Sequence, residues 1–278
     1  MAAISAFRLT SADPESLARF YADIGFTVSP MEQIPLEEMV FLGVAGRGRR
    51  ISMRLGEQRV DIDGFEQRGR PYPTDISPTD LRFQHLAIVT SDAQAAWKRA
   101  QSAGANSIST CGAVTLPASC GGVTAVKFRD PEGHPLEFLQ FPLEADNGWQ
   151  GSGMLGIDHS AISVANAKIS TAFYLRTGLT AGRASLNRGA TQEALDGLEQ
   201  VRVDVVPLLP PVHTPHLELL AYRVPRGAPS DRMEPNDIAA TRVVWSADRN
   251  ALLRDPDGHL HLLNCRATRR PSLRGSEE

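Results

Sequence analysis

The chain has few residues of the kinds that mark several large classes of protein. Its 278 residues include only three cysteines, Cys111, Cys120 and Cys265, which form no Cys-x-x-Cys pair and leave one odd thiol. This argues against a disulfide framework and against a cysteine-rich metal site. No apolar run approaches the roughly 18 to 20 residues that span a bilayer, and the first residues lack the basic head and apolar run of a signal peptide. We therefore expect a cytoplasmic protein with no membrane partner.

The chain also lacks a charge of one sign. It carries 29 Lys and Arg against 32 Asp and Glu, a net charge of −3, with no long basic run that could neutralise many phosphates. Nucleic acid is therefore not the expected partner, and a small-molecule substrate is. With 42% hydrophobic and 22% charged residues the composition is that of a globular protein, and the length allows one large domain or two of ordinary size. Whether the chain forms a homodimer is left open.

One short motif occurs twice. Residues 130–134 read Asp-Pro-Glu-Gly-His and residues 255–259 read Asp-Pro-Asp-Gly-His, each after an arginine and before an apolar run. Proline at the second position and glycine at the fourth are typical of a type I turn, so each copy predicts a β-hairpin, and His134 and His259 are assigned to the turns. The predicted hairpins pair Val123–Phe128 with Leu136–Phe141, and Ala251–Leu253 with Leu260–Leu263.

A second repeated feature is a short strand followed by a capped amphipathic helix. Such openings begin near residues 3, 83 and 157, with Asp13, Asp92 and Asn166 as helix caps. Each opening leaves room for about three further strands, so the unit is β-α-β-β-β. A fourth unit, which opens with Ile238–Trp245, is shortened, because only a few residues separate that strand from the second Asp-Pro-x-Gly-His turn.

These repeats predict an α+β fold in which the units pair into half-barrels. We expect a first domain at residues 1–142, containing units one and two, and a second at residues 154–264, containing unit three and the truncated unit four. Residues 265–278 are polar and without period, and are expected to form a flexible tail. Residues 143–153 would link the two halves.

Strand alternation indicates where the chemistry lies. Because alternate side chains point to opposite faces, His85 shares a face with Ala87, and His159 shares one with Ala161, which leaves space beside each imidazole. Each closing strand places a carboxylate, Glu137 or Glu218, among bulky apolar residues. A buried carboxylate costs several kcal/mol unless it is paired or binds a metal.

The order His85, Glu137, His159, Glu218 gives one imidazole and one carboxylate from each of units two and three. Two imidazoles and two carboxylates suit a divalent ion such as Fe, Mn, Ni, Zn or Co, whose identity stays unknown. Ion pairing of the glutamates with an arginine is the alternative. The other histidines have structural interpretations: His213 and His216 in a loop and at a strand edge, and His261 on the outer face of a sheet.

Two further features are left with alternatives. Tyr222 lies on the face of Glu218 and would contact substrate or simply pack. The stretch Asn187–Gly197 would form a lid over the site or a plain loop.

The repeats, the segment from Asp130 to Glu137 and the His-Glu-His-Glu order resemble the vicinal oxygen chelate superfamily of glyoxalase I, extradiol dioxygenases and bleomycin resistance proteins. The resemblance implies the glyoxalase/bleomycin resistance/dioxygenase fold and a metal that substrates chelate through neighbouring oxygens. Alignment of the repeats puts Ala6 against His159 and Leu262 against Glu137, with Asp61 near a Glu position, so units one and four look metal-free. The full ligand set then requires that units two and three pair.

The resemblance implies three functions. The first is a metal-dependent lyase or isomerase of the glyoxalase type, with Glu137 or Glu218 as the catalytic residue that carries a proton on a small oxygenated carbonyl substrate. The second is an Fe²⁺ extradiol-type dioxygenase that uses His85, His159 and one glutamate. The third is a metal-free binding or resistance protein. The substrate and any glutathione dependence are left open.

Overall fold

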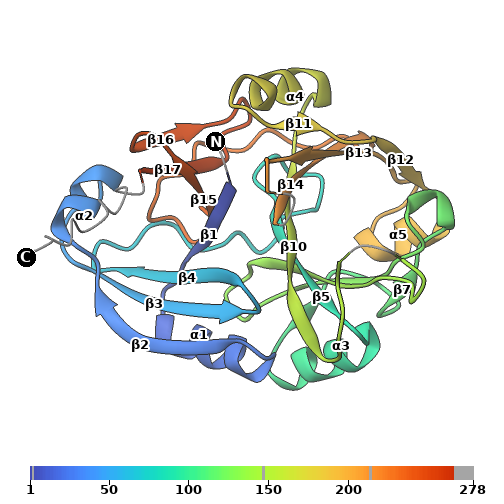
Figure 1. Ribbon diagram of the computed structural model, residues 1–278, viewed down its shortest axis with the longest axis horizontal. Coiled ribbons are helices and arrows are strands. Elements are labelled where there is room, and N and C mark those ends of the chain that lie inside the picture. The colour runs from blue at the N-terminus through green and yellow to red at the C-terminus, as the bar shows by residue number, and fades with distance from the viewer. Residues whose placement is uncertain (2, 146–147, 213–214, 266–278) are drawn as a thin grey trace, which may run out of the picture.

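Two mixed β-sheets and the helices packed on them form the fold, as the computed structural model shows for residues 1, 3–145, 148–212 and 215–265 (Figure 1). The seven-stranded sheet contains β1 (Ala3–Thr10), β2 (Thr27–Gln33), β3 (Gly48–Leu55), β4 (Gln58–Phe65), β15 (Arg242–Ala247), β16 (Ala251–Arg254) and β17 (Leu260–Cys265). The ten-stranded sheet contains β5 (Gln84–Thr90), β6 (Asn106–Ser107), β7 (Val114–Thr115), β8 (Thr124–Arg129), β9 (Pro135–Gln140), β10 (Met154–Ser163), β11 (Thr180–Ala181), β12 (Ser185–Arg188), β13 (Arg202–Leu209) and β14 (His216–Val224). The helices are α1 (Pro14–Asp23), α2 (Leu36–Leu42), α3 (Ala93–Ser102), α4 (Ala167–Arg176) and α5 (Ala190–Asp196), with a 3₁₀ turn at Ala118–Cys120. The α+β class predicted from the sequence is confirmed.

The three predicted strand-then-helix openings are present as β1–α1, β5–α3 and β10–α4. Asp13 Oδ1 accepts a hydrogen bond from the backbone N–H of Ser16, and Asp92 Oδ1 accepts one from Ala95. Asn166 Oδ1 caps α4 in the same way through two backbone N–H groups. The helices begin where they do because these side chains satisfy donors that the first turn leaves free.

The repeated Asp-Pro-x-Gly-His segments form the predicted turns between β8 and β9 and between β16 and β17. In the first, the N–H of Gly133 donates to the carbonyl of Asp130 at 3.0 Å, and the Asp130 carboxylate accepts from the backbone N–H of Glu132 and of His134. Gly133 has φ of +102° and Gly258 has φ of +98°, a region that favours glycine. The structural interpretation of His134 and His259 is thus confirmed.

These turns also join different units. Tyr21 on α1 donates its hydroxyl to Asp130, and Tyr174 on α4 donates its own to Asp255. The ring of His134 bonds to Asp130 at 2.8 Å and reaches the carbonyl of Thr10 at 3.0 Å. A buried carboxylate at each turn therefore holds the helix of one unit against the closing hairpin of another.

The strand order decides which units pair. The seven-stranded sheet runs β16-β17-β15-β1-β4-β3-β2, so units one and four share it through antiparallel β1 and β15. The ten-stranded sheet runs β11-β13-β14-β10-β5-β9-β8-β6, so units two and three share it through antiparallel β5 and β10. Each sheet thus draws strands from both sides of the link at residues 143–153. The two expected domains, 1–142 and 154–264, and the truncation of unit four stay predictions, and residues 266–278 of the expected tail lie outside the described residues.

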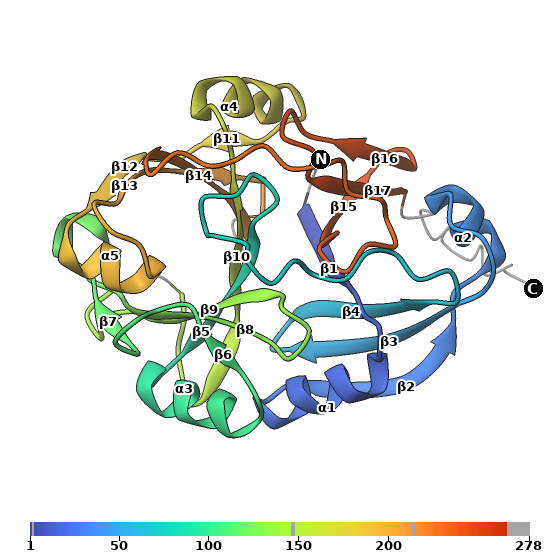
Figure 2. The same ribbon diagram turned by 180° about the vertical axis from the view of Figure 1, so that it is seen from behind.

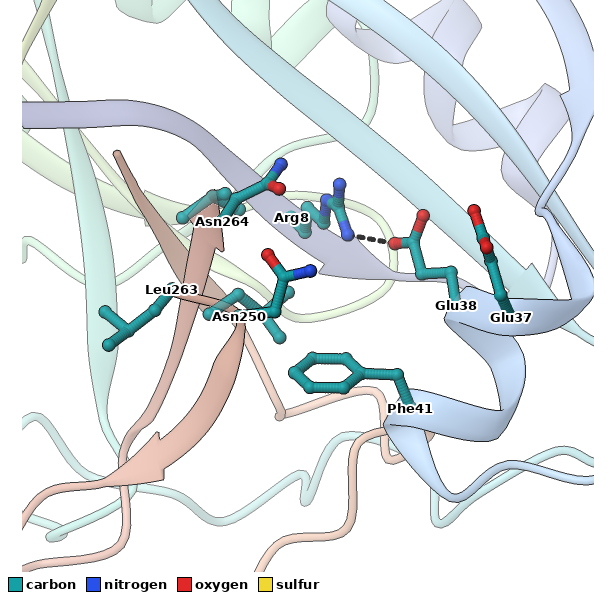
Figure 3. A pocket seen from close by; sticks show the side chains of 9 residues that line it. Arg8, Glu37, Glu38, Phe41, Asn250, Leu263 and Asn264 are labelled. Carbon is teal, nitrogen blue, oxygen red and sulfur yellow. Dashed lines mark hydrogen bonds and ion pairs between the residues drawn. The ribbon is translucent and has the colours of Figure 1, made fainter. Parts of the chain in front are cut away.

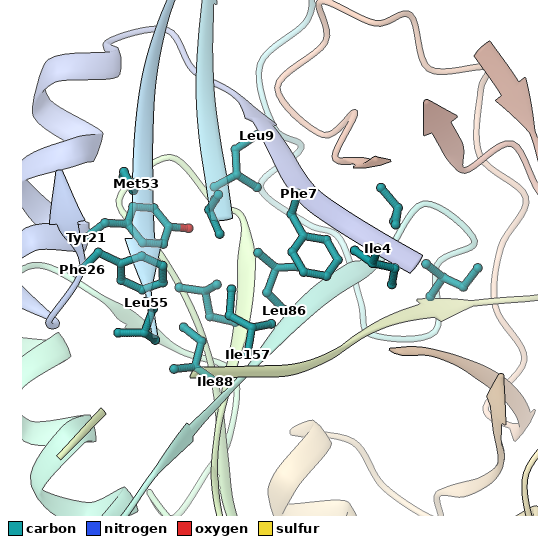
Figure 4. Packing of buried hydrophobic residues seen from close by; sticks show 14 of the residues in the cluster. Ile4, Phe7, Leu9, Tyr21, Phe26, Met53, Leu55, Leu86, Ile88 and Ile157 are labelled. Atoms are coloured by element: carbon teal, nitrogen blue, oxygen red, sulfur yellow. The ribbon is translucent and has the colours of Figure 1, made fainter. Parts of the chain in front are cut away.

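The main hydrophobic core lies between the two sheets. Figure 4 shows Phe7 of β1 close to Leu86 of β5 and Met53 of β3 beside Tyr21 of α1, all within one cluster. The opposite face of β5 carries Ala87, which belongs to a separate cluster with Leu116 and Leu195. Seen from behind, α1 and α3 lie side by side below the sheets (Figure 2). Within the described residues, no helix is both long and apolar enough to cross a membrane.

Candidate metal centre

The four predicted ligands come together on the inner face of the ten-stranded sheet. His85, Glu137, His159 and Glu218 lie on β5, β9, β10 and β14, which are the four adjacent strands β9-β5-β10-β14. The register explains their meeting: Glu137 stands opposite Ala87, and Glu218 stands opposite Ala161. Each carboxylate is thus next to the small residue that follows a ligand histidine by two positions, as strand alternation predicts.

Three of the four are close enough to bind one ion. A carboxylate oxygen of Glu137, Oε2, lies 2.9 Å from Nε2 of His85 and 4.0 Å from Nε2 of His159, and one ligand atom from each lies within 4.8 Å of the others. Oε2 of Glu218 lies 3.5 Å from Nε2 of His159 but outside that group of three. The side chain of Glu137 is 7% exposed and that of Glu218 is 19% exposed.

His85 is buried, and its ring contacts those of Phe83 and His159. Both of its ring nitrogens are buried, and neither makes a hydrogen bond to a described residue, although Nε2 faces the Glu137 carboxylate at 2.9 Å. A nitrogen and an oxygen that face each other without hydrogen-bond geometry are typical of two ligands of one ion. Zn²⁺, for example, binds imidazole nitrogen and carboxylate oxygen at 2.0–2.2 Å. The residues present therefore fit a divalent metal.

The charges at this centre are strongly coupled. Burial alone would lower the pKa of His159, but Glu218 and Asp158 outweigh burial and raise it to about 9. In return, burial would raise the pKa of Glu218, whereas His159 and His216 lower it to about 2. For His85, burial dominates and lowers the pKa. The centre thus holds its carboxylates ionised, as metal ligands must be, whereas His159 is protonated near neutral pH and would have to release its proton when an ion binds.

Two residues at the centre, Asp158 and His216, were not connected with it from the sequence, although His216 does stand at the edge of its strand as expected. Asp158 Oδ2 lies 2.9 Å from Nδ1 of His159, an arrangement that fixes the ring and leaves Nε2 toward the centre. His216, which was assigned to a strand edge, packs with its ring centroid 5.2 Å from that of His159 and its Nε2 3.5 Å from Glu218. Its position two residues before Glu218 puts both on one face, a signal that strand alternation contains. His213 lies outside the described residues.

A cavity of about 230 Å³ opens beside the four ligands. Its walls are largely apolar and include Leu116, Val123, Leu139, Leu195, Val203 and Leu220. The stretch Asn187–Gly197, left as lid or loop, contains α5, which lines the cavity with Gln192 and Leu195. Tyr222 also lines it and donates its hydroxyl to Asp196 on α5, so this residue both packs and faces the cavity.

The seven-stranded sheet has a counterpart of this centre at the same register. In β4, Asp61 stands opposite Arg8 of β1, which is the register that Glu137 has with Ala87. In β17, Leu262 stands opposite Val244 of β15, which is the register that Glu218 has with Ala161. The positions that correspond to the ligands His85, Glu137, His159 and Glu218 are therefore Ala6, Asp61, Arg242 and Leu262. Ala6, Asp61 and Leu262 are the positions that the alignment of the repeats indicated, and the register adds Arg242.

Arginines occupy this counterpart. Arg50 forms two hydrogen bonds with Asp63, at 2.6 and 2.9 Å, while Arg242 Nη1 lies 3.3 Å from the same carboxylate. Arg8 and Arg50 both bond to Glu38 on α2, at the edge of a second cavity of about 330 Å³ (Figure 3). Arg242 and Ala6 stand where the two imidazoles would be needed, and Arg8 and Arg50 neutralise the nearby carboxylates, so this half of the molecule is unsuited to a cation.

The comparisons with known proteins agree with this architecture. The sequence model of the Glyoxalase/Bleomycin resistance protein/Dioxygenase superfamily matches residues 3–138. This match, which covers just under half of the chain, confirms the resemblance inferred from the sequence. No curated protein matches the chain.

Solved structures extend the likeness over the whole fold. Glyoxalase I from Zea mays is 14% identical, with a TM-score of 0.59 over 95% of this chain and 92% of its own, and a single-residue variant of the same enzyme gives 0.62 over the same shares. A protein from Bacillus subtilis described as a "putative dioxygenase" is 14% identical, with a TM-score of 0.55 over 94% of this chain and 84% of its own. At such identity these similarities concern the fold alone.

Proposed function

We propose that the chain is a metal-dependent lyase or isomerase of the glyoxalase type that acts on a small carbonyl substrate with neighbouring oxygens. The observation that carries the proposal is the meeting of His85, Glu137 and His159 within 4.8 Å beside a cavity of about 230 Å³. A pocket of that size accommodates only a small molecule, since drug-sized ligands occupy roughly 300 to 1,000 Å³. The fold similarity to glyoxalase I supports the reaction class without establishing it.

His85, Glu137 and His159 would hold the ion, with Glu218 at its edge. A divalent ion held there would polarise the substrate oxygens and make the adjacent C–H more acidic. The two glutamates then have different roles. Glu137 is the more buried and lies near both histidines, whereas Glu218 stands outside the group of three and is the more exposed.

Glu218 is therefore assigned the proton transfer. Its ionised carboxylate would take the proton from the carbon of the substrate and return it to the neighbouring atom of the same molecule, so that the isomerisation balances. His216, with Nε2 3.5 Å from an oxygen of Glu218, would hold that carboxylate in position.

Exchange of the C–H protons of hydroxyacetone in D₂O, followed by NMR on metal-loaded protein, tests the assignment. We expect exchange in the wild type, loss of exchange with full metal content in Glu218→Gln, and loss of both in Glu137→Gln. Glu199→Gln, at an exposed position, is the matched control. Undiminished exchange in both site variants would overturn the proposal.

One observation favours a second candidate, an Fe²⁺ extradiol-type dioxygenase. The group of three is itself a set of two histidines and one carboxylate, which is the ligand set of non-haem Fe²⁺ oxygenases. Oxygen uptake with catechol after anaerobic loading with Fe²⁺ would favour this reaction over isomerisation. Elemental analysis addresses the third candidate, a metal-free binding protein, because a chain that takes up no divalent metal could only bind its ligand. The cytoplasmic location and a homodimer stay predictions.

A further inference from the structure

A polar cluster lies in the wall of the candidate cavity, on residues that the proposed chemistry does not use. Lys127 Nζ donates to Oδ1 of Asp196 at 2.7 Å, while Gln192 Nε2 and the Tyr222 hydroxyl donate to Oδ2 at 2.8 and 3.1 Å. Lys127, Gln192 and Tyr222 all line the cavity that contains the metal centre. The Asp196 carboxylate thus fixes the position of three side chains at once.

The amide of Gln192 has one defined orientation. Its nitrogen must face Asp196, because the reversed amide would place its oxygen 2.8 Å from a carboxylate oxygen. The amide oxygen Oε1 then has no hydrogen-bond partner among the described residues, although Gln192 is only 3% exposed. A buried acceptor without a partner is unfavourable, so this oxygen is expected to bind a donor that enters the cavity.

The charge balance of the cluster limits what that donor can be. Burial lowers the pKa of Lys127, but Asp196 and Glu137 together outweigh burial and raise it, so the lysine stays charged, with Asp196 as its hydrogen-bonded partner. Lys127 has three N–H groups and uses one of them on Asp196. A neutral group that donates to Gln192 and accepts from Lys127 fits both neighbours. A carboxylate or phosphate would face the Gln192 oxygen and the Asp196 charge, and an ammonium group would face Lys127.

We propose that Gln192 is a specificity-determining residue whose Oε1 accepts a hydrogen bond from a hydroxyl group of the substrate. The substrate class is then a small, uncharged hydroxy compound that carries its chelating oxygens at one end and the hydroxyl at the other. This inference rests on the proposed function, because the chelating end is assigned to the metal centre. α5 supplies both the acceptor and the carboxylate that orients it.

Three hydroxamates of equal heavy-atom count test the proposal, since a hydroxamate chelates metals through two neighbouring oxygens. The probes are 4-hydroxybutanohydroxamate, pentanohydroxamate and 4-aminobutanohydroxamate, which end in a hydroxyl, a methyl and an ammonium group. Their dissociation constants are measured by calorimetry on Zn²⁺-loaded protein and on metal-free protein. We expect the hydroxyl probe to bind the wild type about tenfold more tightly than the methyl probe, because only the hydroxyl satisfies the buried acceptor.

The variant Gln192→Met keeps the length of the side chain and removes the acceptor, so its preference for the hydroxyl probe should disappear. Glu193→Gln, on the same helix and outside the cavity lining, is the control. Equal metal-dependent affinity for all three probes in the wild type would overturn the role of Gln192 and leave the metal centre intact. Binding that does not depend on the metal would instead overturn the proposed function. Because the wild-type comparison decides alone, a variant that fails to fold does not prevent the test.

Discussion

Replacing Asp158 by asparagine tests whether the second layer of the centre positions His159. The carboxylate accepts from Nδ1 of His159 at 2.9 Å through Oδ2 and from the indole N–H of Trp149 at 3.2 Å through Oδ1. An asparagine has only one acceptor oxygen. Its NH₂ group therefore faces either the indole N–H of Trp149 or Nδ1 of His159. One of the two contacts must therefore be lost, and the negative charge behind the ligand is lost in both cases.

The expected effect is weaker metal binding without unfolding. Residues that orient a ligand histidine in this way typically change metal affinity about 10- to 100-fold, or about 1.4 to 2.7 kcal/mol. The Zn²⁺ dissociation constant of Asp158→Asn, measured by competition with a chromophoric chelator, should rise by this factor. Asp204→Asn, which removes the partner of Arg223 on the same sheet, should leave the constant unchanged. An unaltered constant in a folded Asp158→Asn protein would refute the positioning role.

Further predictions concern the rest of the fold. Because burial lowers the pKa of His261 to about 4, against 6.5 when unfolded, the neutral ring stabilises the fold above pH 6.5, and this stability is lost as the pH falls toward 4. In urea unfolding of the wild type, this group should therefore lower the free energy of unfolding by about 2 kcal/mol between pH 7.5 and pH 5. The decrease over the same pH range should be about 2 kcal/mol smaller in His261→Gln, which lacks the titrating ring. Asp130→Ala should lower the free energy of unfolding by about 3 kcal/mol or more, because it leaves buried donors of the turn and of Tyr21 without an acceptor; an equal urea midpoint would contradict this. Metal titration followed by elemental analysis should give one ion per chain, and a count of two would contradict this prediction.

The repeats could be predicted from the sequence because their signals are local. The helix caps Asp13, Asp92 and Asn166 each precede an apolar pattern of helical period, and each caps its helix in the structure. Strand alternation likewise placed His85 and His159 on the cavity face. These features depend on residues within one turn or one strand, where side-chain direction follows from the backbone alone.

The second layer of the site depends on departures from those local rules. Alternation puts Asp158 on the opposite face from His159, but the register of β10 against β5 shifts between Ile157 and His159, and the irregularity brings the carboxylate to Nδ1. Gln192 and Asp196 lie on a helix of seven residues that is too short to show a period. Their meeting with Lys127 is a contact across 69 residues of chain, which no local pattern contains.

The pairing of β5 with β10 has a consequence for how ion binding would affect stability. Two of the four ligand positions, His85 and Glu137, precede the link at residues 143–153, and the other two follow it. A bound ion would thus act as a cross-link between the two parts of the polypeptide, and its binding free energy would oppose their separation as well as local unfolding. After proteolysis at the link the fragments would still share both sheets and the core, and they should separate at a lower urea concentration after chelation than with the ion bound.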